Sequence, residues 1–341
     1  MLDEISLLKN LVSIPSISEQ EQEAVDFLIQ ETKKLDFDEV KKDQAGNYIA
    51  VKGTGKTQIL LLGHIDTVPG DIPVEIRDNN LYGRGSVDAK GSLATFISAV
   101  NKLKNLDNKQ IIIVGTVEEE IASSKGARFI LDKYNPEYIV IGEPSGVYNI
   151  TIGYKGCFRF DYELEKNLMH FSAEEKSVAL QGIEFIQNLQ KFLNTDGDES
   201  IFNQVQLEIR DINTSNNGLK EKIIIKINLR IPPEFDVVSL EEFLSDYPIT
   251  MKEQVGGLLS GKNNKLIRSF LQSIRNNNGN PKFLKKTGTA DFNILGSHFP
   301  DIPIIAYGPG DSKLDHTPNE HLDLDEYAKA INILTNALEL L

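Results

Sequence analysis

The sequence is poor in cysteine: its 341 residues include one, Cys157. A single thiol cannot close an internal disulfide, which excludes a small secreted fold held together by such bonds. Cys157 lies in the strand-like segment GCFRFDYEL, where a small packed side chain is a commoner role than a catalytic nucleophile. Residues 1–12 alternate apolar and charged positions, which is not the pattern of a secretory signal. We therefore expect a cytoplasmic protein.

Long hydrophobic runs and an excess of positive charge are also missing. The longest apolar stretches, such as IIIVGTV at residues 111–117, have the length of a strand and fall short of the ~20 residues that cross a bilayer. Acidic residues number 50 against 36 basic ones, for a formal net charge of -14. A surface of this sign repels phosphate backbones and anionic lipids. Nucleic acid and membranes are therefore not expected as partners, and an acidic substrate would need a local basic patch.

The order of predicted elements indicates the fold class. A chain of 341 residues favours two domains. Strand-like runs alternate with helical patterns up to residue 152, which is typical of an α/β domain. The following stretch is richer in strands, and the α/β pattern returns near residue 260. We predict a discontinuous α/β domain, residues 1–152 and 260–341, with an inserted α+β domain, residues 153–259.

The first helix is predicted over residues 18–34. Ser18 is a residue type that caps helices, and Glu21, three positions later, completes a capping box. Ala24 and Leu28 continue with the spacing of a helix that buries one face.

The segment AVKGTGKT at residues 50–57 contains the GKT of a phosphate-binding loop. That motif needs a glycine where the sequence has Ala50, and its lysine must open a helix. Here GKT leads into the strand-like ILLLGH, so no helix N-terminus is available for phosphate. We predict a glycine-rich hairpin turn, and nucleotide binding is the weakest of the functions considered.

His64 is the first residue with the character of a metal ligand. It ends the apolar run ILLLGH, and Asp66 follows two positions later, on the same side of a strand. An aspartate there can accept one ring N–H and so direct the other ring nitrogen to a metal.

Other metal-binding side chains follow predicted strands or a glycine-rich turn. Singly, each has an ordinary explanation, such as a helix-capping aspartate or a solvated charge run. Together they fall where α/β sheets place their sites, at the carboxyl ends of strands. Histidine with carboxylates suits zinc, and the number of carboxylates favours two metal ions over one. These candidates are Asp88, Glu119, Glu120, Glu143 and His316.

The segments GHIDTVPG, GRGSVDAKG, EEE, GEP and DHTPNE resemble, in order and spacing, the zinc aminoacylase and carboxypeptidase G family, which includes succinyl-diaminopimelate desuccinylase and acetylornithine deacetylase. The resemblance implies a zinc-hydrolase catalytic domain that cleaves amides with two zinc or cobalt ions. It implies one ligand set of His64, Asp88 and Glu143, and a second of Asp88, Glu120 and His316.

The resemblance also implies roles around the metals. Glu119 resembles the general base, and Asp66 the aspartate behind His64. One departure is that Ala122 stands where the family has glycine. The third glutamate, Glu118, leaves the register of the run open, and a slip of one position would reassign both the base and the ligand.

The inserted domain resembles the family's lid and dimerisation domain, so a homodimer is expected. His170, in NLMHFSA, falls where that domain carries a histidine that reaches a neighbouring subunit's site, although the family form is closer to G-x-x-A-H-S. Arg230, Gly288 and Thr289 resemble substrate contacts. A surface arginine at a strand end remains the alternative for Arg230.

The segments EEEIASSKGAR and LDHTPNEHL most resemble the hydrolases that release lysine or ornithine from the acidic amino-group carrier protein LysW, in lysine and arginine biosynthesis. An acidic carrier requires a local basic face on this acidic chain. Two alternatives remain: a deacetylase or desuccinylase of small N-acyl amino acids, such as acetylornithine or succinyl-diaminopimelate, and a non-catalytic metal-binding module. Candidates for the basic face are Lys155, Arg159, Lys285, Lys286 and Lys313.

Overall fold

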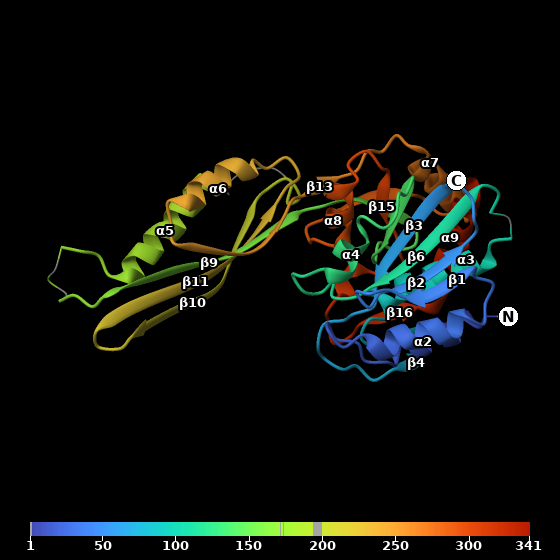
Figure 1. Cartoon of the computed structure of the whole chain (residues 1–341), viewed down its shortest axis with the longest axis horizontal. Coiled ribbons are helices and arrows are strands. Elements are labelled where there is room, and N and C mark those ends of the chain that lie inside the picture. The colour runs from blue at the N-terminus through green and yellow to red at the C-terminus, as the bar shows by residue number, and fades with distance from the viewer. Residues whose placement is uncertain (1, 105, 171, 173, 194–199) are drawn as a thin grey trace. The chain divides into compact units, whose positions relative to one another are not determined.

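The computed structural model describes residues 2–104, 106–170, 172, 174–193 and 200–341. They form two units (Figure 1). The first unit comprises Met1–Ile152, Ser260–Leu284 and Ile294–Leu341, and the second comprises Gly153–Leu259 and Lys285–Asn293.

The first unit is built on a mixed sheet with the strand order β1-β2-β6-β3-β7-β15-β8. Its central strands β3, β6, β7 and β15 run parallel, and β3, β6 and β7 are almost entirely buried, because strands covered on both faces need continuous apolar runs. The strands are β1 (Glu39–Lys42), β2 (Tyr48–Lys52), β3 (Thr57–His64), β6 (Lys109–Thr116), β7 (Tyr138–Gly142), β8 (Asn149–Tyr154) and β15 (Ile304–Ala306).

Helices of the first unit pack with the sheet into one apolar core, to which α1, α2, α3, α7 and α9 contribute buried side chains. A small antiparallel sheet, β16-β5-β4, completes the unit. The helices are α1 (Glu4–Val12), α2 (Gln22–Thr32), α3 (Lys90–Lys102), α4 (Lys125–Ile130), α7 (Lys265–Asn276), α9 (Leu324–Leu340) and the 3₁₀-helix η1 (Ser312–Leu314); the small strands are β4 (Glu75–Arg77), β5 (Asn80–Tyr82) and β16 (His321–Asp323).

The second unit is a four-stranded antiparallel sheet, β10-β11-β9-β12, with α5 and α6 on one face (Figure 1). Alternate residues of β9 and β11, such as Phe158, Phe160 and Ile225, pack under these helices, and the residues between them face away. The elements are β9 (Gly156–Asn167), α5 (Val178–Leu193), β10 (Gln206–Asn216), β11 (Lys220–Ile231), α6 (Val237–Ser245) and β12 (Ile249–Val255). Where the chain passes between the units lie β13 (Leu258–Leu259), β14 (Lys282–Lys286) and α8 (Asp291–His298).

One boundary differs from the sequence prediction, because residues 285–293 belong to the second unit. The reason is a pair of hydrogen bonds to the carbonyl oxygen of Lys155: Thr289 Oγ1 donates at 2.9 Å and Asn293 Nδ2 at 3.2 Å. The assignment of this segment to the catalytic domain is therefore wrong.

Two local predictions are also wrong. The capping box does not form, because α2 begins at Gln22 and Ser18 Oγ donates instead to Asp66 Oδ2 at 2.7 Å. Residues 53–56 are not a hairpin turn, because β6 lies between β2 and β3 in the sheet. In the part of the chain that the structure describes, no helix has both the length and the apolar character needed to cross a bilayer.

Candidate metal centre

Five side chains of the first unit form two groups of possible metal ligands, and Asp88 belongs to both groups. Within each group, the donor atoms all lie within 4.8 Å of one another. The first group is His64, Asp88 and Glu143, and the second is Asp88, Glu120 and His316.

The fold explains this convergence. His64 is the last residue of β3, Glu120 comes shortly after β6, and Glu143 directly follows β7. These strands are neighbours and parallel, so their carboxyl ends meet at one edge of the sheet. Asp88 stands just before α3, and His316 lies in the loop between β15 and β16.

Asp88 joins the two groups through its two carboxylate oxygens. Its Oδ1 lies 3.1 Å from His64 Nε2, and its Oδ2 lies 3.1 Å from His316 Nε2. His316 Nε2 is also 3.1 Å from Glu120 Oε1. The other ring nitrogen of His64, Nδ1, lies 2.8 Å from the carbonyl oxygen of Asp66, so an N–H there leaves Nε2 free to bind a metal.

The carboxylate of Asp66 is not the nearest partner of that ring, because its Oδ1 is 3.6 Å from His64 Nδ1. It accepts instead the backbone N–H groups of Glu119 and Glu120, both at 3.0 Å. The backbone carbonyl of Asp66 is therefore the main group that orients His64. The side chain of Asp66 holds the backbone of the glutamate run.

The centre has an excess of negative charge. Burial lowers the pKa of His64, but the neighbouring carboxylates of Asp66 and Asp88 outweigh this effect and hold the pKa well above its ordinary value. Hydrogen bonds with Asp88 and Glu120 raise the pKa of His316 to about 10. Divalent cations neutralise such an excess, and zinc bonds of about 2.0–2.1 Å in a tetrahedron put neighbouring ligand atoms roughly 3.3 Å apart. Three donor pairs lie 3.1 Å apart, and Glu143 lies within 4.8 Å of the other donors of its group, so the donor set fits two such ions.

The three glutamates point to different places. Glu118 accepts hydrogen bonds from Ser123 Oγ at 2.7 Å and Lys125 Nζ at 3.0 Å. Glu120 belongs to the second donor group. Glu119 belongs to neither group, yet its charge contributes to the raised pKa of His64, so it lies close to the centre.

Three of the remaining predicted residues, Arg230, Gly288 and Thr289, lie in the second unit. Arg230 Nη1 donates to Thr289 Oγ1 at 2.7 Å, so the structure brings this pair together. Gly288 borders open space, with nothing within 4 Å of the position where a Cβ would stand.

His170 is exposed, with its Nδ1 2.7 Å from Ser172 Oγ. Residues 171 and 173 of the predicted NLMHFSA segment lie outside the described residues. The role of His170 stays a prediction.

Sequence reasoning missed one buried carboxylate of the centre, Glu320. Its Oε1 accepts the N–H groups of Val87 at 3.0 Å and Asp88 at 3.2 Å, and its Oε2 accepts from Arg84 Nη1 at 2.8 Å. Glu320 thereby fixes the backbone of the residue that joins the two donor groups. A signal was present, since Glu320 closes the quoted segment DHTPNE.

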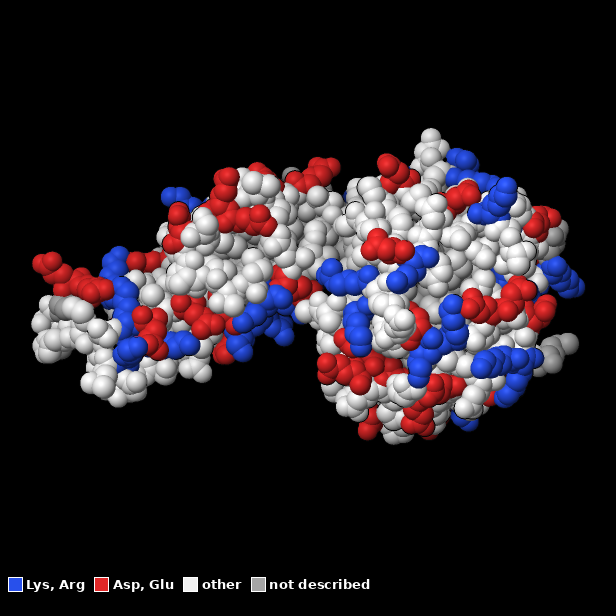
Figure 2. Space-filling model, viewed as in Figure 1, with Lys and Arg blue, Asp and Glu red and all other residues white. Residues whose placement is uncertain are grey.

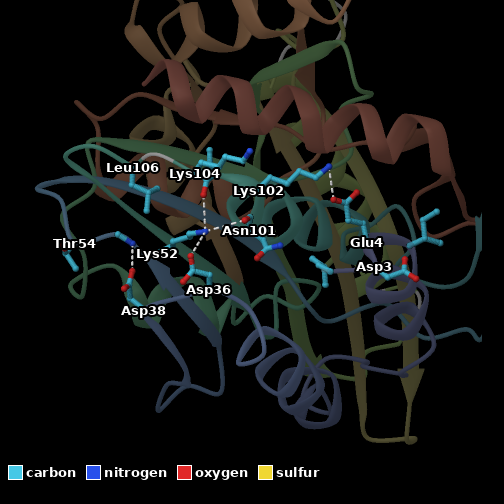
Figure 3. A pocket seen from close by; sticks show the side chains of 14 residues that line it. Asp3, Glu4, Asp36, Asp38, Lys52, Thr54, Asn101, Lys102, Lys104 and Leu106 are labelled. Carbon is cyan, nitrogen blue, oxygen red and sulfur yellow. Dashed lines mark hydrogen bonds and ion pairs between the residues drawn. The ribbon is translucent and has the colours of Figure 1, made fainter.

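A separate cavity of ≈ 1060 Å³ in the first unit contains none of the donor residues (Figure 3). Lys52 Nζ donates there to the carbonyl oxygens of Asn101 and Leu103, and Lys102 Nζ pairs with Glu4 at 2.9 Å. Both lysines therefore have partners within the lining of this cavity.

Comparisons with known proteins identify the family. Peptidase family M20/M25/M40 matches residues 60–340. The chain belongs to this family. The [LysW]-lysine hydrolase of Deinococcus radiodurans is 40% identical over 97% of this chain and 95% of its own. The putative [LysW]-lysine/[LysW]-ornithine hydrolase of Thermococcus kodakarensis is 38% identical over 99% of this chain and 92% of its own.

Solved structures of the M20 family share the fold over the whole chain. The M20 metallo-carboxypeptidase Sso-CP2 of Sulfolobus solfataricus has a TM-score of 0.76 at 18% identity, covering 100% of this chain and 99% of its own. The dinuclear metal-binding peptidase YXEP of Bacillus subtilis has a TM-score of 0.71 at 14% identity, covering 98% and 96%. The M20 protein described here is therefore a hydrolase of amide bonds whose centre provides for two divalent metal ions. A non-catalytic binding module is not favoured.

Proposed function

We propose that this enzyme releases lysine, and also ornithine, from the carrier protein LysW by hydrolysing the amide that joins them. The observation that carries the proposal is similarity over nearly the full length to hydrolases named for these substrates, at 38–40% identity. The same proposal places the enzyme in lysine and arginine biosynthesis in the cytoplasm.

For the site, we propose two zinc or cobalt ions, held by the two donor groups that share Asp88. When bound, the ions polarise the amide carbonyl and lower the pKa of a water molecule. Glu119 takes the proton of the attacking water on its carboxylate and returns it to the leaving amine. Its position outside both donor groups supports this role, because its carboxylate is not needed to hold a metal.

Arg230 is the proposed contact for the carboxylate of the released amino acid. It is half-buried, the described residues form no ion pair with its guanidinium, and its Nη1 donates to Thr289 Oγ1 at 2.7 Å. A guanidinium in this state is ready to bind a substrate carboxylate, and Thr289 orients it. His170 is proposed to stabilise the oxyanion in a homodimer. The long, exposed edge strand β10 of the second unit offers a surface for that dimer.

The basic residues suggested as contacts for the carrier differ in their exposure and in the partners they already have. Lys155 is fully buried, with its Nζ on the carbonyl oxygen of Ile201, so it cannot meet a partner. Arg159 pairs with Glu253 at 3.1 Å. Lys285 and Lys313 are exposed, and acidic and basic side chains are interspersed over the visible face of each unit (Figure 2). The proposal for the carrier contact is therefore reduced to Lys285, the half-buried Lys286 and Lys313.

The test is release of free lysine and ornithine from LysW-linked substrates, with acetylornithine and succinyl-diaminopimelate alongside, with and without added zinc or cobalt. Metal-dependent release from the carrier alone is the expected result. Cleavage of a small acyl substrate, with no release from the carrier, would support metal-dependent amide hydrolysis but contradict the proposal that LysW carries the substrate.

A further inference from the structure

Four consecutive backbone amides at the end of β6 are each bound by a side chain from elsewhere in the first unit. The N–H groups of residues 117–120 are accepted in order by Asn47 Oδ1, Glu21 Oε1, Asp66 Oδ1 and Asp66 Oδ2, at 3.1, 3.0, 3.0 and 3.0 Å. The backbone is thus fixed residue by residue along the stretch that carries the three glutamates.

The second of these bonds lies where the chain direction changes. Glu118 has a φ of 60°, in the left-handed region that costs a residue with a side chain roughly 1–2 kcal/mol. This conformation turns Glu118 towards Ser123 and Lys125, while Glu120 reaches the donor cluster. The amide of Glu118 is therefore the point at which Glu21 can restrain this turn, while Asp66 holds the following amides of Glu119 and Glu120 separately.

Glu21, which accepts that amide, is itself firmly held. It is 5% exposed, and its Oε1 also accepts the N–H of Glu19 at 3.0 Å. The segment before it is attached to the end of β3, since Thr67 N–H donates to Ser16 O at 2.9 Å and Ile17 forms a parallel bridge with Thr67. This segment precedes residue 60, where the family match begins.

We propose that Glu21 is a positioning residue of the active centre. By binding the amide of Glu118, its carboxylate holds Glu119 where it can exchange a proton with the attacking water and the leaving amine. The N-terminal segment therefore contributes to catalysis without touching substrate or metal. The inference rests on the proposed role of Glu119 as the base.

The expected size of the effect follows from the buried amide. Without an acceptor, the amide of Glu118 is left unsatisfied, at a cost of about 1–3 kcal/mol, and it regains a partner if the loop shifts. A displacement of about 1 Å at a catalytic group lowers a rate by roughly 100-fold. The donor groups are attached through Asp66 and Glu320, so metal binding should survive this shift.

The experiment compares Glu21→Ala, Glu21→Gln and the control Glu23→Ala in the metal-loaded enzyme. Glu23 is exposed and two residues away in the same sequence segment. Glu21→Ala should lower kcat about 100-fold with KM and metal content unchanged. Glu21→Gln, whose amide oxygen still accepts the N–H, should stay within about threefold of wild type. Hydrogen exchange of the peptide covering residues 117–120 should accelerate in Glu21→Ala and not in the control.

A double-mutant cycle separates positioning from general destabilisation. If Glu21 acts through Glu119, then Glu21→Ala causes no further loss in a Glu119→Ala background. Additive losses, a kcat of Glu21→Ala within about threefold of wild type, or unchanged exchange would each overturn the proposal. Should Glu21→Ala not fold, Glu21→Asp, with a carboxylate one methylene short of the amide, takes its place in the same cycle.

The test does not depend on the identity of the substrate. Rates are compared with wild type on whichever amide it cleaves, and hydrogen exchange needs no substrate. A wrong assignment to LysW therefore leaves this result interpretable, and failure of the Glu21 proposal leaves the LysW assignment standing.

Discussion

Replacing Glu119 with glutamine should abolish most activity and leave both metal ions bound. Glu119 belongs to neither donor group, and its backbone is held by Asp66, so the five donors remain in place when its carboxylate is removed. Loss of a general base costs ~10²–10⁴-fold in kcat, or about 2.7–5.4 kcal/mol in the barrier. The assay combines steady-state amide hydrolysis with metal content by mass spectrometry. A loss of less than about tenfold would refute the role of Glu119.

The neighbouring glutamates are the matched controls, because the sequence alone left their register open. Glu118→Ala removes a carboxylate that binds Ser123 and Lys125, so it should reduce stability more than kcat. Glu120→Ala removes a metal donor and should lower metal content. If Glu118→Ala instead reproduced the behaviour expected of Glu119→Gln, the assignment would be wrong by one residue.

Three further predictions concern the metal, the substrate and the carrier. His64→Ala should lose bound metal, and a chelator should lower the Tm of wild type but not of this variant. The control His298→Ala, at an exposed histidine, should still bind metal and should still show a lower Tm with the chelator. Arg230→Ala should lower kcat/KM by about 10- to 150-fold, with Arg230→Lys recovering only part, and an unchanged kcat/KM would rule out a carboxylate contact. The double charge reversal Lys285→Glu, Lys313→Glu should raise KM about three- to tenfold for LysW-linked substrates. It should leave KM unchanged for any small acyl substrate that is cleaved. An equal rise in KM for the two kinds of substrate would exclude a carrier contact at these lysines.

The parts of the fold that sequence predicts well are those in which local pattern and burial agree. The runs that became β3, β6 and β7 are apolar along their centres, and both their strand character and their burial follow from that. Because parallel strands end at one edge, the residues after them could be expected to meet, as His64, Glu120 and Glu143 do around Asp88. The quoted family motifs added roles that spacing alone does not supply.

The parts that sequence missed depend on contacts between distant residues. Strand order is not a local property, so the insertion of β6 between β2 and β3 could not be read from residues 53–56. Residues 285–293 join the second unit through hydrogen bonds to Lys155, about 130 positions earlier in the chain. Ser18 and Glu21 match a capping box perfectly well by type, yet their side chains bind Asp66 and the amide of Glu118.

The buried acids around the centre share one physical role. Asp66, Glu320 and Glu21 each accept backbone N–H groups of residues next to or within the donor set. Hydrogen bonds from backbone N–H groups partly offset the repulsion between these carboxylates and their acidic neighbours, such as that between Glu320 and Asp88. Without metal, repulsion among the clustered carboxylates would displace the backbone that carries them unless other groups hold it in place. Acids bound to amides meet this need. From the sequence alone, Asp66 is placed behind His64, Glu21 is interpreted as part of a capping box, and Glu320 is assigned no role.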